Sequence, residues 1–134
     1  MLESTRQYAL AKLAASGELE RFARRHAEYF RDVAQRAEKS FGAIPLSDWL
    51  AILEPDVENI RAAMDWALVR DQDVVVGATI AGALDMFWWH GGAEAEGVRW
   101  IKAALRKIDE SQHADVGVRL RHGLALLMSR VLYS

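Results

Sequence analysis

Apolar residues recur at spacings of three and four along most of this chain, which is the period of an amphipathic α-helix. The pattern is clearest over residues 18–39, where acidic and basic residues alternate four apart on the opposite side. We therefore expect one long helix here, with its charged side exposed to solvent. Its inward positions are Leu19, Phe22, His26, Tyr29, Phe30, Val33 and Ala37.

The same period predicts six further helices joined by short polar turns. Gly17 is expected to end a first helix, because glycine commonly terminates helices. We expect Ser47 to cap a short helix and Pro55 to occupy the first turn of the next one. The six helices are expected over residues 3–16, 47–53, 55–69, 74–89 and 93–108, and from Val116 almost to the chain end.

This helix order predicts an all-α fold of antiparallel hairpins. Trp66 and Trp100 lie 34 residues apart, each inside the first helix of a predicted helix–turn–helix pair. Thirty-four residues is the tetratricopeptide period. We therefore expect a tetratricopeptide-like right-handed solenoid fragment. Two hairpins would occupy residues 55–134, behind N-terminal linker helices in residues 1–54.

The last predicted helix carries a continuous apolar stripe. Inner repeats of a solenoid expose apolar faces when the array is cut. One expectation is therefore a homodimer formed through this helix, and the other is a piece of a longer repeat array. The candidate self-association face is Leu120, Leu124, Leu127 and Val131.

Aromatic residues gather near the ends of the predicted helices. Consecutive helical residues point in different directions, so at least one of Phe87, Trp88 and Trp89 should reach the surface or a groove. Packing between hairpins is the simpler interpretation, and a groove for a peptide or a small apolar ligand is the alternative. The candidate groove residues are Trp66, Phe87, Trp88, Trp89 and Trp100.

Composition narrows the classes of function. Half of the residues are hydrophobic (51%), which is enough to form a core, and the absence of cysteine excludes disulfides and thiolate chemistry. A net charge of −2 gives no basic footprint for direct nucleic-acid binding. The longest uncharged run, residues 74–84, is about half of a membrane span. We expect a cytoplasmic chain that binds neither nucleic acid nor membrane directly.

No sequence feature predicts catalysis. The four histidines lack zinc-binding spacing, and no glycine-rich phosphate loop is present. Acidic pairs lie near helix starts or turns, where the helix dipole favours them. We expect no enzyme, no cofactor and no metal, and an all-helical metal enzyme that uses such a pair is the weaker alternative. The pairs are Asp56/Glu58, Asp71/Asp73, Glu94/Glu96 and Asp109/Glu110.

Several short motifs resemble those of a known family when they are taken in order. The stretch 1–18 is followed by Arg25-His26 and Tyr29-Phe30, and later motifs extend the series to about residue 108. The order resembles bacterial STAND-type ATPase regulators, the NB-ARC-like proteins among LuxR-type and AfsR-like transcription factors. The later motifs are Trp49-Leu50, Asn59-Ile60-Arg61-Ala62-Ala63, Trp66-Ala67-Leu68, Phe87-Trp88-Trp89, Glu96-Gly97 and Trp100-Ile101.

The resemblance implies a piece of a larger switch protein. An ATPase module with a winged helix would precede Met1, and further repeats would follow Ser134. The ATP-binding motifs of the family are absent from these residues, so the resemblance implies no ATPase activity here. It implies a non-catalytic interaction or sensor arm that binds a protein or peptide partner, or the rest of its own chain. The alternative is a helical domain that binds a small inducer in an aromatic-lined pocket.

Overall fold

A computed structural model describes residues 2–133 of the chain. Over these residues the backbone is helical with no strand, which confirms the all-α prediction. A 3₁₀ turn, Glu54–Asp56, and a π-helical segment, Asp65–Val69, flank α3. No helix in this described part is long and apolar enough to cross a bilayer. The α-helices are α1 (Leu2–Ser40), α2 (Leu46–Leu53), α3 (Val57–Met64), α4 (Val74–Ala83), α5 (Asp85–His90), α6 (Glu94–Lys107) and α7 (Ala114–Tyr133).

Helix α1 is continuous, so the expected break at Gly17 is wrong. Gly17 lies inside a 39-residue helix, and its backbone does not adopt the positive φ that ends helices at glycine. A glycine inside a helix costs only about 1 kcal/mol relative to alanine. The strong helix formers on both sides, Ala14 and Ala15 before it and Glu18 and Leu19 after it, offset this cost.

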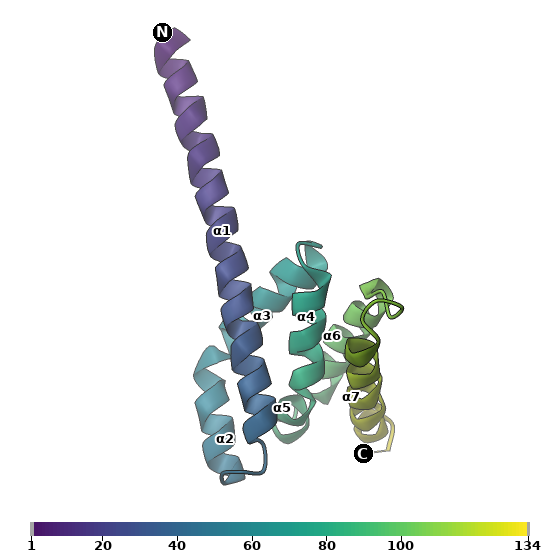
Figure 1. The fold of residues 1–134 in the computed structure, drawn as a ribbon. Helices are drawn as coiled ribbons and strands as arrows, with labels where there is room; N and C mark the ends of the chain where they lie inside the picture. The colour runs from purple at the N-terminus through teal and green to yellow at the C-terminus, as the bar shows by residue number, and fades with distance from the viewer. Residues whose placement is uncertain (1, 134) are drawn as a thin grey trace.

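The first half of α1 stands away from the rest of the molecule (Figure 1). Every residue from Glu3 to Phe22 is exposed, apart from the partly exposed Gly17. From Ala27 onward, one side of the helix is buried against α3 and α4. We call residues 3–22 the arm and the remaining described chain the body.

Helix α4 forms the centre of the body. It contacts α1, α3, α6 and α7, and most of its residues are buried. Small residues permit this close packing. A Cβ atom at Gly77 would lie 2.5 Å from the Leu68 Cγ atom. The prediction that residues 74–89 begin as a closely packed helix is therefore confirmed for α4.

Two expected helix boundaries are wrong. Helix α2 begins at Leu46 after Pro45, and no side chain caps it, so Ser47 lies within the first turn. The predicted helix over residues 74–89 is interrupted at Leu84, where φ is −107° and ψ is 20°. Asp85 then begins α5, and its carboxylate accepts a hydrogen bond from the Met86 backbone N–H at 2.8 Å.

Replacing Gly17 with alanine should stiffen the arm. No heavy atom lies within 4 Å of the position that the new Cβ would take, so the methyl group adds helix propensity without a clash. The expected gain is about 1 kcal/mol in local helix stability, seen as slower amide exchange in residues 3–22. The matched control is Gly42→Ala, which should not stabilise because Gly42 has φ of 87°. Unchanged exchange in the arm would contradict a continuous α1.

Candidate functional site

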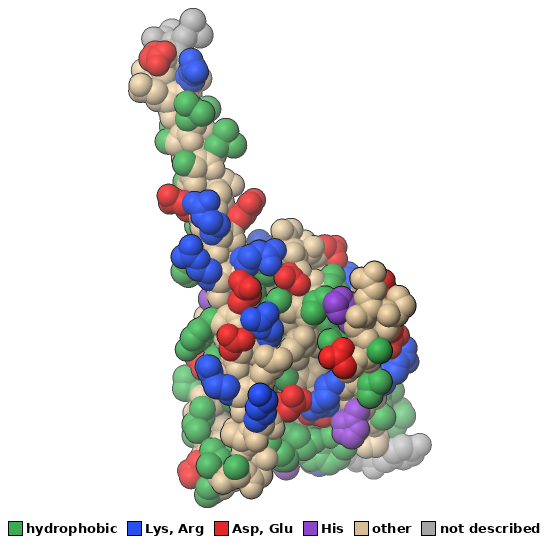
Figure 2. All heavy atoms as spheres, viewed as in Figure 1, with side chains coloured by type: hydrophobic (Ala, Val, Ile, Leu, Met, Phe, Trp, Pro, Cys, Tyr) green, Lys and Arg blue, Asp and Glu red, His purple; other side chains and the backbone are tan. Residues whose placement is uncertain are grey.

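The arm carries large apolar side chains on two sides of its helix, and nothing in the described chain covers them. Its large apolar residues, Tyr8, Leu10, Leu13, Leu19 and Phe22, leave between 57% and 69% of their surface exposed. Figure 2 shows such side chains along the arm, with Lys and Arg side chains where the arm meets the body. Large exposed apolar side chains gathered in one part of a protein mark interaction sites.

One side of the arm forms a regular ridge. Its members follow one another at spacings of three and four, so they lie on one face of the helix. Beside its lower end lies a shallow hollow of about 580 Å³, lined in part by Glu18, Arg21 and Arg25. We call the residues Tyr8, Ala11, Ala15, Leu19 and Phe22 the arm ridge.

At its lower end the arm ridge reaches the body. Phe22 also lines a second hollow of about 310 Å³, together with Ala62 and Trp66. The guanidinium of Arg24 lies 5.2 Å from the centre of the Trp66 ring, and its Nη1 donates to the Asp73 carboxylate at 2.9 Å. A cation over an aromatic face is attracted to the ring. Trp66 is therefore held at the junction and remains partly exposed.

Trp66 belongs to the π-helical segment Asp65–Val69. The Arg70 backbone N–H donates to the Asp65 carbonyl oxygen at 3.0 Å, which is a bond across five residues. Short π-helical segments inside helices occur frequently at functional sites. The segment sets the direction of Trp66 next to the arm.

The predicted aromatic groove is divided among separate places. Phe87 and Trp88 are in contact, with ring centres 5.3 Å apart, and they line a hollow of about 330 Å³. Trp89 lies under Arg130, at 4.6 Å, on another surface. The Trp100 Nε1 atom donates to Glu96 at 3.1 Å. Phe87 and Trp89 are partly exposed and Trp88 is buried, as expected for consecutive helical residues.

The hollow at Phe87 is bounded by α2, α3 and α5. Leu50 and Val57 supply apolar walls, and Glu54 and Arg61 supply charge. The Trp88 Nε1 atom is buried and has no hydrogen-bond partner among the described residues. The pyrrole edge of that indole faces α6, where a Cβ at Gly97 would lie 2.8 Å from the Trp88 Cδ1 atom.

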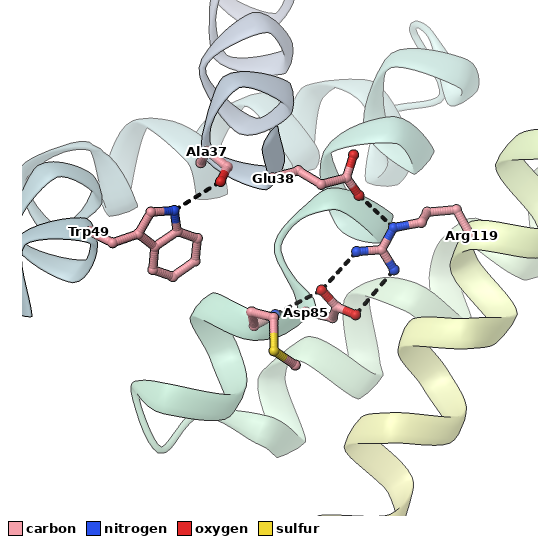
Figure 3. Close-up of polar contacts among 6 residues, drawn as sticks. Ala37, Glu38, Trp49, Asp85 and Arg119 are labelled. Carbon is pink, nitrogen blue, oxygen red and sulfur yellow. Dashed lines mark hydrogen bonds and ion pairs between the residues drawn. The ribbon is translucent and has the colours of Figure 1, made fainter. Parts of the chain in front are cut away.

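Trp49 was missed as a structural residue by the sequence reading. It is 2% exposed, and its Nε1 donates to the Ala37 carbonyl oxygen at 2.8 Å (Figure 3). Its ring lies 6.5 Å from Phe87. Trp49 and Leu53 are four residues apart on a short amphipathic helix, and this spacing was the available signal.

The apolar stripe of α7 is divided between core and surface. Leu120 and Leu127 are fully buried in the body, and Leu124 is partly buried. Val131 is exposed. Two of the four residues predicted for self-association therefore pack within this chain, and the remaining exposed apolar side chains of α7 include Val118 and Leu132.

A buried ion network joins α1, α5 and α7 (Figure 3). Asp85 is 2% exposed, and it accepts hydrogen bonds from Arg119 Nη1 and Nη2 at 3.1 and 2.9 Å. Arg119 Nε donates to Glu38 at 2.5 Å. Burial lowers the pKa of Arg119, but the hydrogen bonds to Asp85 and Glu38 outweigh it and raise the pKa overall. The network fixes the lower half of α1 to the last helix.

The acidic pairs considered for catalysis are largely engaged in ion pairs between helices or turns. Asp71 pairs with Lys107, Glu96 with Arg61, and Glu110 with Arg121. Within residues 2–133, no three His, Asp or Glu side chains converge as metal ligands do. These contacts give the carboxylates a role in fixing the helices to one another.

The Arg61–Glu96 pair predicts a specific pH dependence. Two hydrogen bonds of 2.8 Å from Arg61 hold the pKa of Glu96 below its ordinary value, with a further contribution from Trp100. A carboxylate with a lowered pKa contributes stability above its unfolded pKa, and the contribution is lost as the pH falls through its folded pKa.

Glu96→Gln should therefore reduce the loss of unfolding free energy seen below about pH 4.5. Urea unfolding between about pH 5 and 3 measures this. The control is Glu20→Gln, which changes an exposed carboxylate without an ion pair in the described chain. Parallel pH profiles for both variants would contradict the assignment.

Comparison with known proteins links the chain to transcriptional regulators. A scan against family models found no match, and a search of the solved structures gave no significant match. Relatives in Mycobacterium bovis and Mycobacterium tuberculosis are provisionally named HTH-type transcriptional regulators. They are 30% identical over 108 residues, which is 78% of this chain and 12% of each relative. The chain is thus similar to a short segment of much longer regulators.

Proposed function

We propose that this chain is a non-catalytic interaction segment of a signal-responsive transcriptional regulator. The similarity to HTH-type regulators supports a regulatory role. The chain aligns with 12% of the length of each relative, which supports the view that it is a piece of a larger protein. The observation that carries the interaction role is the arm. Its ridge is apolar and exposed, and it projects from a body that has its own core.

A physical argument supports the arm as the interacting element. In proteins, most of the stability of a helix comes from packing its apolar face rather than from its helix propensity. The arm presents such a face without a partner. A partner surface that covers the arm ridge would stabilise the helix and bury its large side chains.

The family resemblance extends the proposal. Residues 1–54 would be the linker helices that follow the winged-helix ATPase module of a STAND-type regulator, and residues 55–134 would be tetratricopeptide-like hairpins. The partner would be a protein, a peptide or the rest of the same chain. The site of action would be the cytoplasm.

The test places charge on the arm ridge inside the regulator. Tyr8→Glu with Ala11→Glu should abolish signal-dependent transcription, because two carboxylates would enter the covered face. Gln7→Glu with Ser16→Glu adds the same charge off the ridge and should leave the response intact. The melting temperature of the 134-residue chain should not change in either variant, since these residues contact no part of the body. An unchanged response in the ridge variant would refute the interaction role.

The hollow beside Phe87 supports a second candidate, the binding of a small apolar inducer. Its volume of about 330 Å³ falls in the range of ligand pockets, and its walls are aromatic and aliphatic. A ligand bound to the folded state raises the melting temperature. Indole should therefore raise it in the wild-type chain and not in Val57→Asp. No rise with indole would remove this support.

A further inference from the structure

We propose that the junction of arm and body is a docking site for an amphipathic helix whose apolar face is flanked by carboxylates. This inference rests on the proposed function and names the chemistry of the partner. The site, which we call the elbow, has an apolar floor and a basic border. The floor is Leu19, Phe22, Ala62 and Trp66, and the border is Arg21 and Arg25.

The floor of the elbow is continuous from α1 to the π-helical segment. Phe22 lines both hollows and so links the arm ridge to Trp66. Leu19 and Phe22 are each about two-thirds exposed, and Ala62, which is also exposed, lines the same hollow as Phe22 and Trp66. A helix binds to such a surface through apolar residues at positions i, i+3 or i+4, and i+7.

Trp66 is suited to anchor this partner. Tryptophan is enriched among the residues that dominate binding energy at interfaces. The Arg24 guanidinium, itself fixed by Asp73, holds the ring from one side and leaves it partly exposed. A ring held in place before binding loses less conformational entropy on binding.

The charges of the elbow determine which charge is favoured on either side of the partner's apolar face. Arg21 and Arg25 are exposed and make no ion pair in the described chain, whereas Arg24 and Arg70 are paired with Asp73 and Asp65. Glu18 is the one acidic residue that lines the hollow of about 580 Å³ together with Arg21 and Arg25. Complementary charge across an interface determines which partner binds. An acidic flank is therefore preferred over a basic one.

The exposed face of α7 is not an apolar face with acidic flanks, which argues against a second copy of the chain that binds the elbow through α7. Its apolar residues Val118, Val131 and Leu132 are accompanied by Arg121 and Arg130. Arg121 and Arg130 are already paired with Glu110 and Glu94, and Asp115 is the one carboxylate that α7 could place opposite Arg21 and Arg25. Helix α2 is acidic and exposes Ile52, but it has only eight residues.

The test uses two designed helical peptides of about two heptads with identical leucine positions. One carries Glu on both flanks and the other carries Lys. Binding to the 134-residue chain is followed by tryptophan emission, and Trp66→Phe identifies the signal of that ring. We expect the Glu-flanked peptide to bind about tenfold more tightly at low salt, with the difference shrinking at high salt.

Charge reversal on the chain provides the matched controls. Arg21→Glu with Arg25→Glu should reverse the preference between the peptides. Arg36→Glu with Lys39→Glu changes two exposed cations further along α1 and should leave it unchanged. Equal binding of both peptides, no binding, or self-association of the chain through this surface in light scattering would overturn the proposal.

The same variants in the regulator separate the two proposals. If Tyr8→Glu with Ala11→Glu abolishes the response while Arg21→Glu with Arg25→Glu leaves it intact, the interaction role holds and the elbow is wrong. If neither pair alters the response, both proposals fail. If each pair abolishes the response, both proposals are supported.

Discussion

Replacing Arg119 with alanine is expected to lower the free energy of unfolding by about 3–5 kcal/mol, because it leaves a buried charge without its partner. Asp85 is 2% exposed and receives two hydrogen bonds from Arg119. No other side chain is within hydrogen-bond reach of its carboxylate among the contacts of the described chain. Urea unfolding followed by circular dichroism measures the loss.

Two controls separate the buried network from ordinary surface charge. Arg121→Ala removes an exposed pair with Glu110 on the same helix and should leave the unfolding midpoint almost unchanged. Arg119→Met with Asp85→Leu removes the buried carboxylate together with its half-buried partner and should recover part of the stability lost in Arg119→Ala. If Arg119→Ala were as mild as Arg121→Ala, the network would have no structural role.

Trp49→Ala is expected to destabilise the chain by about 3–5 kcal/mol, the usual cost of removing a buried tryptophan. The substitution removes the ring that packs against Phe41 and Phe87, and it removes the hydrogen bond to the Ala37 carbonyl. Because α2 has few other contacts with α1, its position depends on this residue. Chemical denaturation gives the free energy.

Trp49→Phe should lower the free energy of unfolding by less than Trp49→Ala. It keeps an aromatic ring at this position and loses only the hydrogen bond and part of the side-chain volume. Ile52→Ala is the matched control on the same helix, because Ile52 is 64% exposed and should contribute little. A loss in Trp49→Ala no larger than in Ile52→Ala would show that α2 is held by other contacts.

The sequence predicts most helices because their apolar period is strong. The turn at Asp71-Gln72-Asp73 is where it was expected, and Asp73 caps α4 by accepting from the Val76 backbone N–H. Gly17 was wrongly expected to end a helix, because the free-energy cost of one glycine in a helix is small compared with the helix propensity of its neighbours. The break at Leu84 has no glycine or proline at that position or directly after it to signal it in the sequence, and Asp85, which follows it, pairs with Arg119 at a distance of 34 residues along the chain.

The candidate sites were harder to predict than the helices. Trp66, Trp89 and Trp100 lie on three different elements and contact different partners, Arg24, Arg130 and Glu96, so the sequence pattern could not show that they do not line one groove. Whether Leu120 faced the core or a partner depended on α7 packing back against α6 and α4. Leu19 and Phe22 were expected to face inward, and that was wrong: both are about two-thirds exposed, because α1 packs against the body only from about Ala27 onward. The tetratricopeptide-like architecture stays a prediction.

We expect a partner surface to cover the arm in the regulator, and cysteine labelling tests this directly. The chain contains no cysteine, so Tyr8→Cys introduces a single reactive site on the arm ridge. Gln112→Cys in an exposed turn is the reference. We predict that a maleimide reacts with Tyr8→Cys quickly in the 134-residue chain and markedly more slowly in a regulator otherwise free of cysteine. Equal rates in the two proteins, relative to the reference, would contradict the account.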